Sequence, residues 1–309
     1  METVRNLDPS RAPIASDAVQ AIHAFSTGSA FQHKEHRTGS VLPQLWWVLT
    51  SRSWVGLPIS VFLIEHKDGL VLFDTGLDPA ITTDPDYISQ AIGRLLLKRI
   101  FRFEIGPGDK LGHRLDAHGF DPRKVRKAVI SHLHFDHVGG ISDIPQADLL
   151  VSEDEWAQLS EPHPEREWIL REHIEAEGAQ WTPIRFQPTE DPQFKTFGGA
   201  FDIMGDGSLI LLPTPGHTPG SMSLLVRSSS GPPTLLVGDL VYCADAIMED
   251  RVPGTGDPKQ LRKTYAKVRR LKEAMPDLLI IPSHDDAAIA ALRAAWTLLP
   301  SEGKEAANG

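Results

Sequence analysis

The chain is almost free of cysteine and lacks any long hydrophobic run. Only one of its 309 residues, Cys243, is a cysteine, so neither an intramolecular disulfide nor a thiolate metal cluster can form within one chain. No apolar run approaches the ~20 residues that a membrane-spanning helix needs. Residues 1–17 also lack the apolar segment of a secretory signal. We therefore expect a soluble cytoplasmic protein with no membrane partner.

Basic residues are also fewer than acidic ones. The sequence holds 31 Lys and Arg residues against 41 Asp and Glu residues, a formal net charge of −10. This balance argues against a broad electrostatic grip on nucleic acid or anionic lipid, although a local basic face is compatible with it. With 41% hydrophobic and 23% charged residues, the composition is that of a globular protein with an ample core. We predict a single domain over residues 1–309, with a loose arm over residues 1–20 and a frayed tail over residues 302–309.

Short apolar segments and helical periodicities alternate along the chain. Segments 59–64 and 70–73 are β-branched and aromatic, and an Asp-Gly turn between them predicts a hairpin. Asp257 followed by Pro258 is typical of a helix start. Further strands are expected near 129–130, 148–151, 208–212, 222–226, 234–237 and 278–281, and helices over 88–101, 153–159, 165–176, 258–274 and 286–297. This order predicts an α/β (α+β) layered domain.

The strongest chemical signal is a cluster of histidines that directly follows an apolar strand. Three imidazoles and a carboxylate lie within six residues, namely His132, His134, Asp136 and His137. Core packing explains them poorly, because buried polar groups without partners are costly. A divalent metal would satisfy them, since imidazole nitrogens and carboxylate oxygens are among its usual ligands. A surface cluster of polar residues is the alternative.

Three more polar residues, His217, Asp239 and His284, each come just past an apolar strand. Strand ends can bring them to one edge of a sheet, and the count of ligands then favours two metal ions. One ion would take His132, His134 and His217, the other Asp136, His137 and His284, and Asp239 would bridge them. Two ions ~3.5–4 Å apart can share a hydroxide whose pKa is lowered toward neutrality, so we predict hydrolytic chemistry. Zn²⁺ is the common expectation, while Mn²⁺, Fe²⁺ or Co²⁺ would also suit these ligands.

The pattern His132-x-His134-x-Asp136-His137, followed by His217, Asp239 and His284, resembles the metallo-β-lactamase superfamily. The resemblance extends over about residues 57–292 and implies an αββα sandwich with a dinuclear site on one edge. The turn Phe73–Gly76 also resembles that superfamily. There the resemblance implies that Asp74 supports the histidine loop.

Within the superfamily, the chain is similar to the N-acyl-homoserine lactonases. The similarity rests on Asp239-Leu-Val-Tyr242, the metal loop, Leu57–Ser60 and Thr214–Gly220. It implies an acylated lactone substrate (quorum quenching) and a homodimer. It also implies catalytic roles for Tyr242, which would hydrogen-bond the substrate oxygen, and for Asp136, which would pass a proton to the leaving alkoxide. The alternative for Tyr242 is a half-buried core tyrosine. Ser221 stands where many such lactonases have histidine, and residues 79–115 do not align.

Other superfamily activities use the same ligands. A thioester hydrolase of the glyoxalase II type would need basic residues for the glutathione carboxylates, and no such set is identifiable; a hydrolase of other lactones or esters remains open. A nuclease is disfavoured by the net charge of −10. Trp46, Trp47, Trp54 and the helix over 88–101 are expected to wall an acyl-chain groove or a dimer contact, with ordinary core packing as the alternative.

Overall fold

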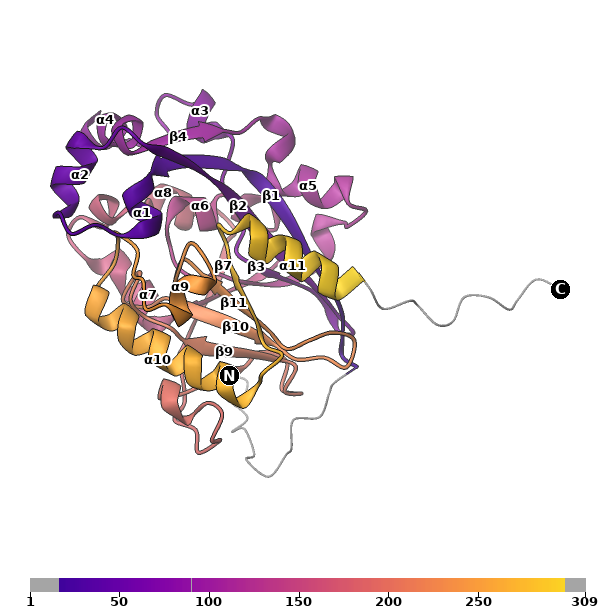
Figure 1. Ribbon diagram of the computed structural model, residues 1–309. Coiled ribbons are helices and arrows are strands. Elements are labelled where there is room, and N and C mark those ends of the chain that lie inside the picture. Colours follow the sequence, from indigo (N-terminus) through magenta and orange to yellow (C-terminus); the bar gives the residue numbers. More distant parts are fainter. Residues whose placement is uncertain (1–16, 90, 298–309) are drawn as a thin grey trace.

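Two β-sheets face each other in the computed structural model, which describes residues 17–89 and 91–297 (Figure 1). The larger sheet has seven strands in the order β4-β1-β2-β3-β5-β6-β7, and the smaller has five in the order β12-β11-β10-β9-β8. The strands of the larger sheet are β1 (Val19–His33), β2 (Trp54–His66), β3 (Gly69–Phe73), β4 (Phe101–Glu104), β5 (Val125–Val129), β6 (Asp148–Ser152) and β7 (Gln180–Ile184). Those of the smaller sheet are β8 (Phe201–Asp202), β9 (Leu209–Pro213), β10 (Met222–Val226), β11 (Thr234–Gly238) and β12 (Leu279–Pro282).

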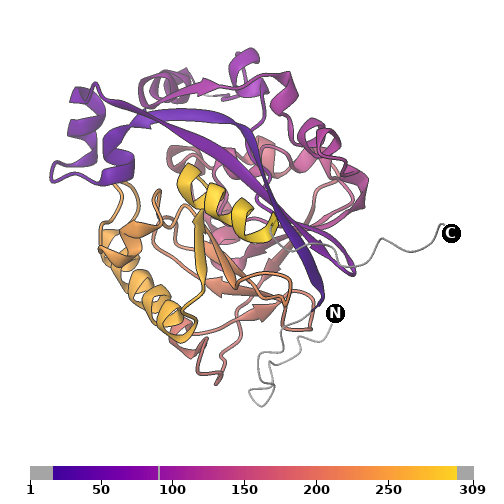
Figure 2. The ribbon, with the colours of Figure 1, turned by 45° about the vertical axis from the view of Figure 1, so that its right-hand side comes forward.

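Helices cover the outer faces of both sheets. The α-helices are α1 (Lys34–Thr38), α2 (Gln44–Thr50), α3 (Ala80–Thr83), α4 (Ala91–Ile100), α5 (Leu111–Ala117), α6 (Phe135–Val138), α7 (Glu153–Trp156), α8 (Arg171–Ile174), α9 (Asp245–Met248), α10 (Pro258–Ala274) and α11 (Asp286–Thr297). Short 3₁₀ turns lie at Pro107–Asp109, Pro122–Lys124, Ile141–Asp143, Ala157–Ser160, Pro164–Glu167 and Lys195–Phe197. The turned view in Figure 2 shows α10 lying along the outer side of the smaller sheet.

Three apolar layers hold this arrangement together. Between the sheets, Phe62 and Phe73 of the larger sheet meet Leu211 and Leu224 of the smaller one, and all four are fully buried. Alternate residues point outward, because side chains on a strand alternate between its faces. Leu63 therefore packs in the layer under α5, while the apolar stripe of α10 packs on the smaller sheet. The predicted αββα sandwich is confirmed.

Helix α10 begins as its sequence predicts. The Asp257 carboxylate accepts hydrogen bonds from the backbone N–H groups of Lys259 and Gln260, and Pro258 occupies the first turn. Its buried stripe comprises Leu261, Thr264, Tyr265, Val268 and Leu271, so the basic residues of this helix lie on the remaining faces, as predicted.

Several predictions about elements need correction. Strand β1 was not predicted, and it overlaps the expected loose arm from Val19 onward; residues 1–16 and the predicted tail over 302–309 lie outside the described residues. The helix expected over 88–101 is α4, which ends at Ile100, with Phe101 already in β4. The helix expected over 165–176 is broken, because Trp168 takes a left-handed conformation with φ of 63° that an α-helix excludes. The prediction of a single domain stays a prediction.

Strand direction brings distant loops to one edge of the sandwich. Strands β3, β5, β6 and β7 are mutually parallel, as are β11 and β12 in the other sheet. The loops after β3, β5, β11 and β12 therefore leave their sheets at the same kind of end, where ligands commonly bind in open α/β sheets. Among the described residues, no helix is both long and apolar enough to span a bilayer.

Candidate metal centre

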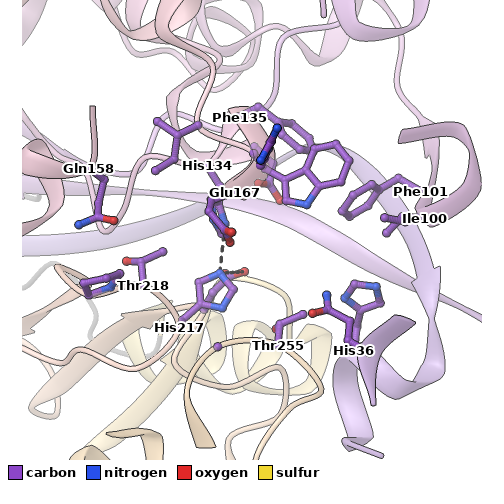
Figure 3. A pocket seen from close by; sticks show the side chains of 18 of the residues that line it. His36, Ile100, Phe101, His134, Phe135, Gln158, Glu167, His217, Thr218 and Thr255 are labelled. Carbon is purple, nitrogen blue, oxygen red and sulfur yellow. Dashed lines mark hydrogen bonds and ion pairs between the residues drawn. The ribbon is translucent and has the colours of Figure 1, made fainter. Parts of the chain in front are cut away.

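Three imidazoles converge at the end of β5. Nε2 of His132 lies 3.0 Å from Nδ1 of His134, which lies 3.1 Å from Nε2 of His217. Figure 3 shows His134 and His217 facing each other at the cavity, joined by a dashed line. Metal–nitrogen bonds of about 2.0–2.1 Å at tetrahedral angles separate the nitrogens by about 3.3 Å, so this spacing suits one small cation. The structure thus brings together the three residues predicted for the first site.

A second cluster adjoins the first. Nε2 of His137 and Nε2 of His284 lie 3.8 and 3.6 Å from the two carboxylate oxygens of Asp136. All three side chains are buried, and their donor atoms lie within 4.8 Å of one another. These are the residues predicted for the second site.

Asp239 lies between the two clusters, just past β11. Its Oδ1 is 3.0 Å from Nε2 of His284 and 3.3 Å from Nε2 of His137, whereas its Oδ2 is 3.6 Å from Nε2 of His217. One carboxylate therefore turns a separate oxygen toward each cluster, which is the arrangement that a bridging ligand requires. All seven predicted residues come together at one edge of the sandwich, with contributions from both sheets.

Unpartnered polar atoms provide a test of whether a cation fits. Nε2 of His137, Nε2 of His284 and Oδ1 of Asp239 are buried and make no hydrogen bond among the described residues, although they face one another. Buried polar groups without partners are costly, and a cation would satisfy all three. The donor set is made of nitrogen and oxygen atoms only, which suits Zn²⁺ and similar divalent ions. The residues present therefore fit the divalent metal ions predicted for this site.

The protonation states of the first cluster favour metal binding. Burial lowers the pKa of His134 to about 4, with help from the charge of His137, and it lowers the pKa of His217 to about 3. Burial and the neighbouring imidazoles also lower the pKa of His132. Near neutral pH these rings are uncharged and carry free lone pairs, as a metal ligand must.

In the second cluster, neighbouring charges outweigh burial in setting the pKa values. Burial opposes a proton on His137, but the carboxylates of Asp74 and Asp239 outweigh it and raise the pKa of that ring. Asp239 likewise raises the pKa of His284 against the effect of burial. Burial also opposes ionisation of Asp239, yet the two rings together lower the pKa of this carboxyl. A cation would take the place of the protons that these rings otherwise share with the carboxylates.

The carboxylate of Glu155, which the sequence did not single out, ties the two histidine loops together. Its Oε1 accepts a hydrogen bond of 2.9 Å from the Leu133 N–H, and its Oε2 accepts bonds from the Thr218 hydroxyl (2.6 Å) and the Gly220 N–H (3.1 Å). Glu155 is fully buried in α7, and burial raises its pKa despite these bonds. A Cβ on Gly220 would lie 2.0 Å from the Glu155 backbone nitrogen, so this close contact requires glycine. In the sequence it is one acidic residue among several in the segment 153–159, and nothing there distinguishes it from its neighbours.

A cavity of about 720 Å³ opens over the clusters, within the range of ordinary small-molecule sites. His134, Asp136, His217 and Asp239 line it, and so does Tyr242. The Tyr242 ring is buried, stacks on His284 at a centroid distance of 5.6 Å and meets His217 edge-on. Burial and the Asp239 carboxylate raise the pKa of its hydroxyl, which therefore remains a hydrogen-bond donor.

One wall of the cavity is aromatic. Phe101 meets Trp168 and Phe135 edge-to-face at centroid distances of 5.3 and 5.7 Å, and Ile100 lies beside them. In Figure 3, Ile100 and Phe101 lie on one side of the cavity and Gln158 and Thr218 on the other. Of the segment expected to be a helix over 88–101, only its C-terminal end, Ile100 and Phe101, lines the cavity. The leucines at positions 95–97 and Phe103, on which the predicted groove was based, do not line it.

The tryptophans predicted for the groove lie elsewhere. None of Trp46, Trp47 and Trp54 lines this cavity; Trp47 is buried in the apolar cluster beneath α2, and Trp46 is exposed. The guanidinium carbon of Arg102 lies over the Trp54 ring, 4.1 Å from the ring centroid. Trp168, which does line the cavity, was missed because its segment was predicted to be helical.

Comparisons with known proteins agree with this geometry. A family model described as "Metallo-beta-lactamase superfamily" matches residues 54–284. The chain is similar to an N-acyl homoserine lactonase, AttM, of Rhizobium radiobacter, at 30% identity over 235 residues, which cover 74% of this chain and 82% of the relative. It is also similar to a probable metallo-hydrolase of Mycobacterium tuberculosis, at 30% identity over 254 residues, covering 75% of this chain and 76% of the relative.

A solved structure shares the fold. The structure of an N-acyl homoserine lactone hydrolase, with the product N-hexanoyl-L-homoserine bound at its catalytic metal centre, superposes with a TM-score of 0.70. The match covers 89% of this chain and 96% of that chain at 20% sequence identity, so it supports the architecture.

Proposed function

This chain belongs to the metallo-beta-lactamase superfamily, and from that premise we propose that it is a dinuclear metal-dependent lactonase that opens the ring of N-acyl homoserine lactones. The carrying observation is Asp239, whose two oxygens face separate His/Asp clusters on the floor of a cavity with one aromatic wall. A polar reaction centre beside an apolar wall suits an amphiphilic substrate with a lactone head and an acyl tail. The lactonases among the curated relatives support the same substrate class.

The metal sites are assigned to the seven clustered residues. His132, His134 and His217 would hold one ion, Asp136, His137 and His284 the other, and Asp239 would hold both. When bound, two divalent cations, most simply Zn²⁺, supply an activated water at neutral pH and polarise a carbonyl. The homodimeric state and the cytoplasmic location stay predictions.

Two side chains of this chain then act on the substrate. The Tyr242 hydroxyl, which stays protonated, donates a hydrogen bond to the substrate oxygen on which negative charge develops. Asp136 lines the cavity at the edge of the second cluster, where its carboxylate can take the proton of the attacking water and deliver it to the leaving alkoxide. The aromatic wall of Phe101, Phe135 and Trp168 excludes water beside the acyl chain.

A thioester hydrolase that acts on glutathione conjugates is the second candidate, and the cavity disfavours it. Arg166 is the only lysine or arginine among the described residues that line the cavity. Two glutathione carboxylates would call for more than one such partner. Other lactones and esters remain acceptable substrates for the same centre.

A substrate panel tests the proposal. Metal-replete protein is given N-acyl homoserine lactones, S-lactoylglutathione and a phosphodiester, and proton release is followed with a pH indicator. We expect lactone opening to exceed the other reactions, with longer acyl chains preferred because they reach the aromatic wall. Turnover of the thioester without turnover of the lactones would overturn the assignment while leaving a metal-dependent hydrolase in place.

A further inference from the structure

Exposed apolar side chains are concentrated on one face, formed by the segment 41–50, which includes α2, and by α4. Seven large hydrophobic residues are markedly exposed among the described residues, and six of them lie here, each at least 46% exposed: Val41, Leu42, Trp46, Leu49, Leu95 and Leu96. Monomeric proteins rarely gather exposed apolar groups in this way without a binding role. We call these six residues the α2–α4 face.

The two helices form one continuous surface. A guanidinium nitrogen of Arg99 in α4 donates a hydrogen bond of 2.7 Å to the backbone carbonyl of Leu49 in α2. Trp47 and Val48 of α2 and Leu97 of α4 pack into one buried cluster below the surface. Each helix therefore already buries its own apolar side, so the exposed apolar residues are not needed for packing within the chain. Figures 1 and 2 both show α2 and α4 next to each other at one end of the molecule.

The segments that form this face are rich in basic residues, against the overall balance of the chain. Residues 34–54 hold three basic residues and one acidic one, and residues 91–103 hold four basic residues and no acidic one, in a protein with a net charge of −10. Within the part of the chain that the structure describes, six of these seven cations make no ion pair, the exception being Arg94, which contacts Asp86. Arg99 donates a hydrogen bond to the Leu49 carbonyl and Arg102 lies over the Trp54 ring. The four that make neither kind of contact are Lys34, Arg37, Arg52 and Lys98. An anionic occupant would complement them.

We propose that the α2–α4 face binds the surface of an anionic lipid bilayer, a membrane partner that the overall composition of the chain did not lead us to expect. Leucine and tryptophan side chains rimmed by lysine and arginine are the combination that partitions into the interface between headgroups and acyl chains. Basic residues near an anionic membrane each strengthen binding, and tryptophan favours the same depth. A second copy of the chain is a poorer occupant, because a two-fold contact would place this cationic rim against itself.

The face adjoins the mouth of the cavity. Gln44 at the start of α2 and Ile100 at the end of α4 both line the cavity, two and four residues respectively from exposed members of the face, Trp46 and Leu96. A molecule bound to a bilayer by this face would therefore hold its cavity mouth near the acyl chains, where amphiphilic compounds accumulate. The surface itself does not depend on which reaction the metal centre catalyses.

Vesicle flotation with the full-length, metal-loaded protein tests the proposal. We expect binding to vesicles that contain about 30 mol% phosphatidylglycerol, weaker binding at high salt, and little binding to pure phosphatidylcholine. Reversing two unpaired cations, with Arg52→Glu and Lys98→Glu together, should lower the partition coefficient by about 30-fold or more. Removing apolar area, with Trp46→Ser and Leu95→Ser together, should also abolish most binding.

Matched controls place the same changes elsewhere. Lys263→Glu with Arg270→Glu reverses two exposed cations of α10, and Met248→Ser removes the seventh exposed hydrophobic residue; both should leave binding unchanged. Absence of binding to anionic vesicles, or equal losses in the controls, would overturn the proposal. So would a dimer in light scattering that Trp46→Ser with Leu95→Ser converts to a monomer without any vesicle binding, since the face would then belong to a second copy.

Discussion

Nδ1 of His137 donates a hydrogen bond of 2.8 Å to Oδ2 of Asp74, and both side chains are buried. The same carboxylate accepts bonds from the N–H (2.7 Å) and the hydroxyl (2.9 Å) of Ser131. Asp74 holds a left-handed backbone conformation with φ of 60°, which is uncommon for a residue other than glycine and is held here by these contacts. Because Nδ1 is committed as a donor, Nε2 of His137 turns its lone pair toward the metal cluster.

Replacing Asp74 should therefore weaken metal binding without removing a ligand. Asp74→Asn lowers the acceptor capacity beside His137, and we expect the affinity of the second site to fall about 10–100-fold. Competition with a chromophoric chelator measures this affinity. Asp86→Asn, the same change at an exposed position, is the control. Wild-type affinity in Asp74→Asn would show that the contact does not orient His137.

Metal removal should abolish turnover reversibly. We expect about two ions per chain, loss of activity on chelation, and recovery on addition of Zn²⁺. An ion at 100 times its dissociation constant should add about 2.7 kcal/mol to the free energy of unfolding. His132→Ala should lose the ion of the first cluster, whereas His118→Ala, at an exposed histidine, should keep both. Full activity in stripped protein would contradict the dinuclear assignment.

Most of the fold could be predicted from local sequence patterns. The hairpin of β2 and β3 followed from its Asp-Gly turn, and α10 from its N-cap and proline. Strand β1 was missed because its sequence mixes small and polar residues and contains Gly28, so it lacks the β-branched runs typical of strands. Its 15 residues are stabilised by pairing with both β2 and β4, which is a tertiary effect.

The candidate site was predictable where its chemistry is local and hidden where its contacts are made by the backbone. The seven clustered residues were predicted because four lie in one segment and the others follow strands. Glu155 was not, since two of its three partners are the N–H groups of Leu133 and Gly220, which leave no mark on residue type. Trp168 reaches the cavity from a left-handed bend in the backbone. No adjacent proline or glycine in the sequence indicates this bend.

Removal of the Tyr242 hydroxyl should slow the reaction at constant metal content. If the hydroxyl stabilises developing charge on the substrate, Tyr242→Phe should lower kcat about 100-fold, as loss of one such donor does elsewhere. Tyr265→Phe is the matched control, because that buried hydroxyl donates to the Leu240 carbonyl and does not line the cavity. It should cost about 1 kcal/mol of stability and leave kcat unchanged. Unaltered kcat in Tyr242→Phe would assign Tyr242 to packing alone.

Replacing Glu155 should lower both the free energy of unfolding and the metal affinity of the first site. In Glu155→Gln an amide nitrogen replaces one acceptor, so a buried donor on the Leu133 or the Thr218–Gly220 side loses its partner. We expect a loss of about 2 kcal/mol in the free energy of unfolding and weaker metal binding by the cluster of His132 and His217. Urea titration and chelator competition measure the two effects. Glu153→Gln, an exposed change in the same helix, should show neither.

Acidification should destabilise the protein through His36, which lines the cavity from α1. Burial lowers the pKa of this ring from 6.5 to about 3, and the charges of His33 and His217 add to the effect. Below pH 6.5 the unfolded chain binds a proton that the folded chain refuses, so the free energy of unfolding falls as the pH drops from 6.5 toward 3. At pH 5 the loss from this ring alone is about 2 kcal/mol.

The variant His36→Asn removes this titration. Its free energy of unfolding, measured in urea at pH 7.5 and pH 5, should fall about 2 kcal/mol less than that of the wild type. Proton competition at the metal centre acts on both proteins and cancels in the comparison, so the difference belongs to residue 36. His113→Asn, at an exposed histidine, should run parallel to the wild type. If His36→Asn also runs parallel, the ring does not enter the folded state as a neutral buried group.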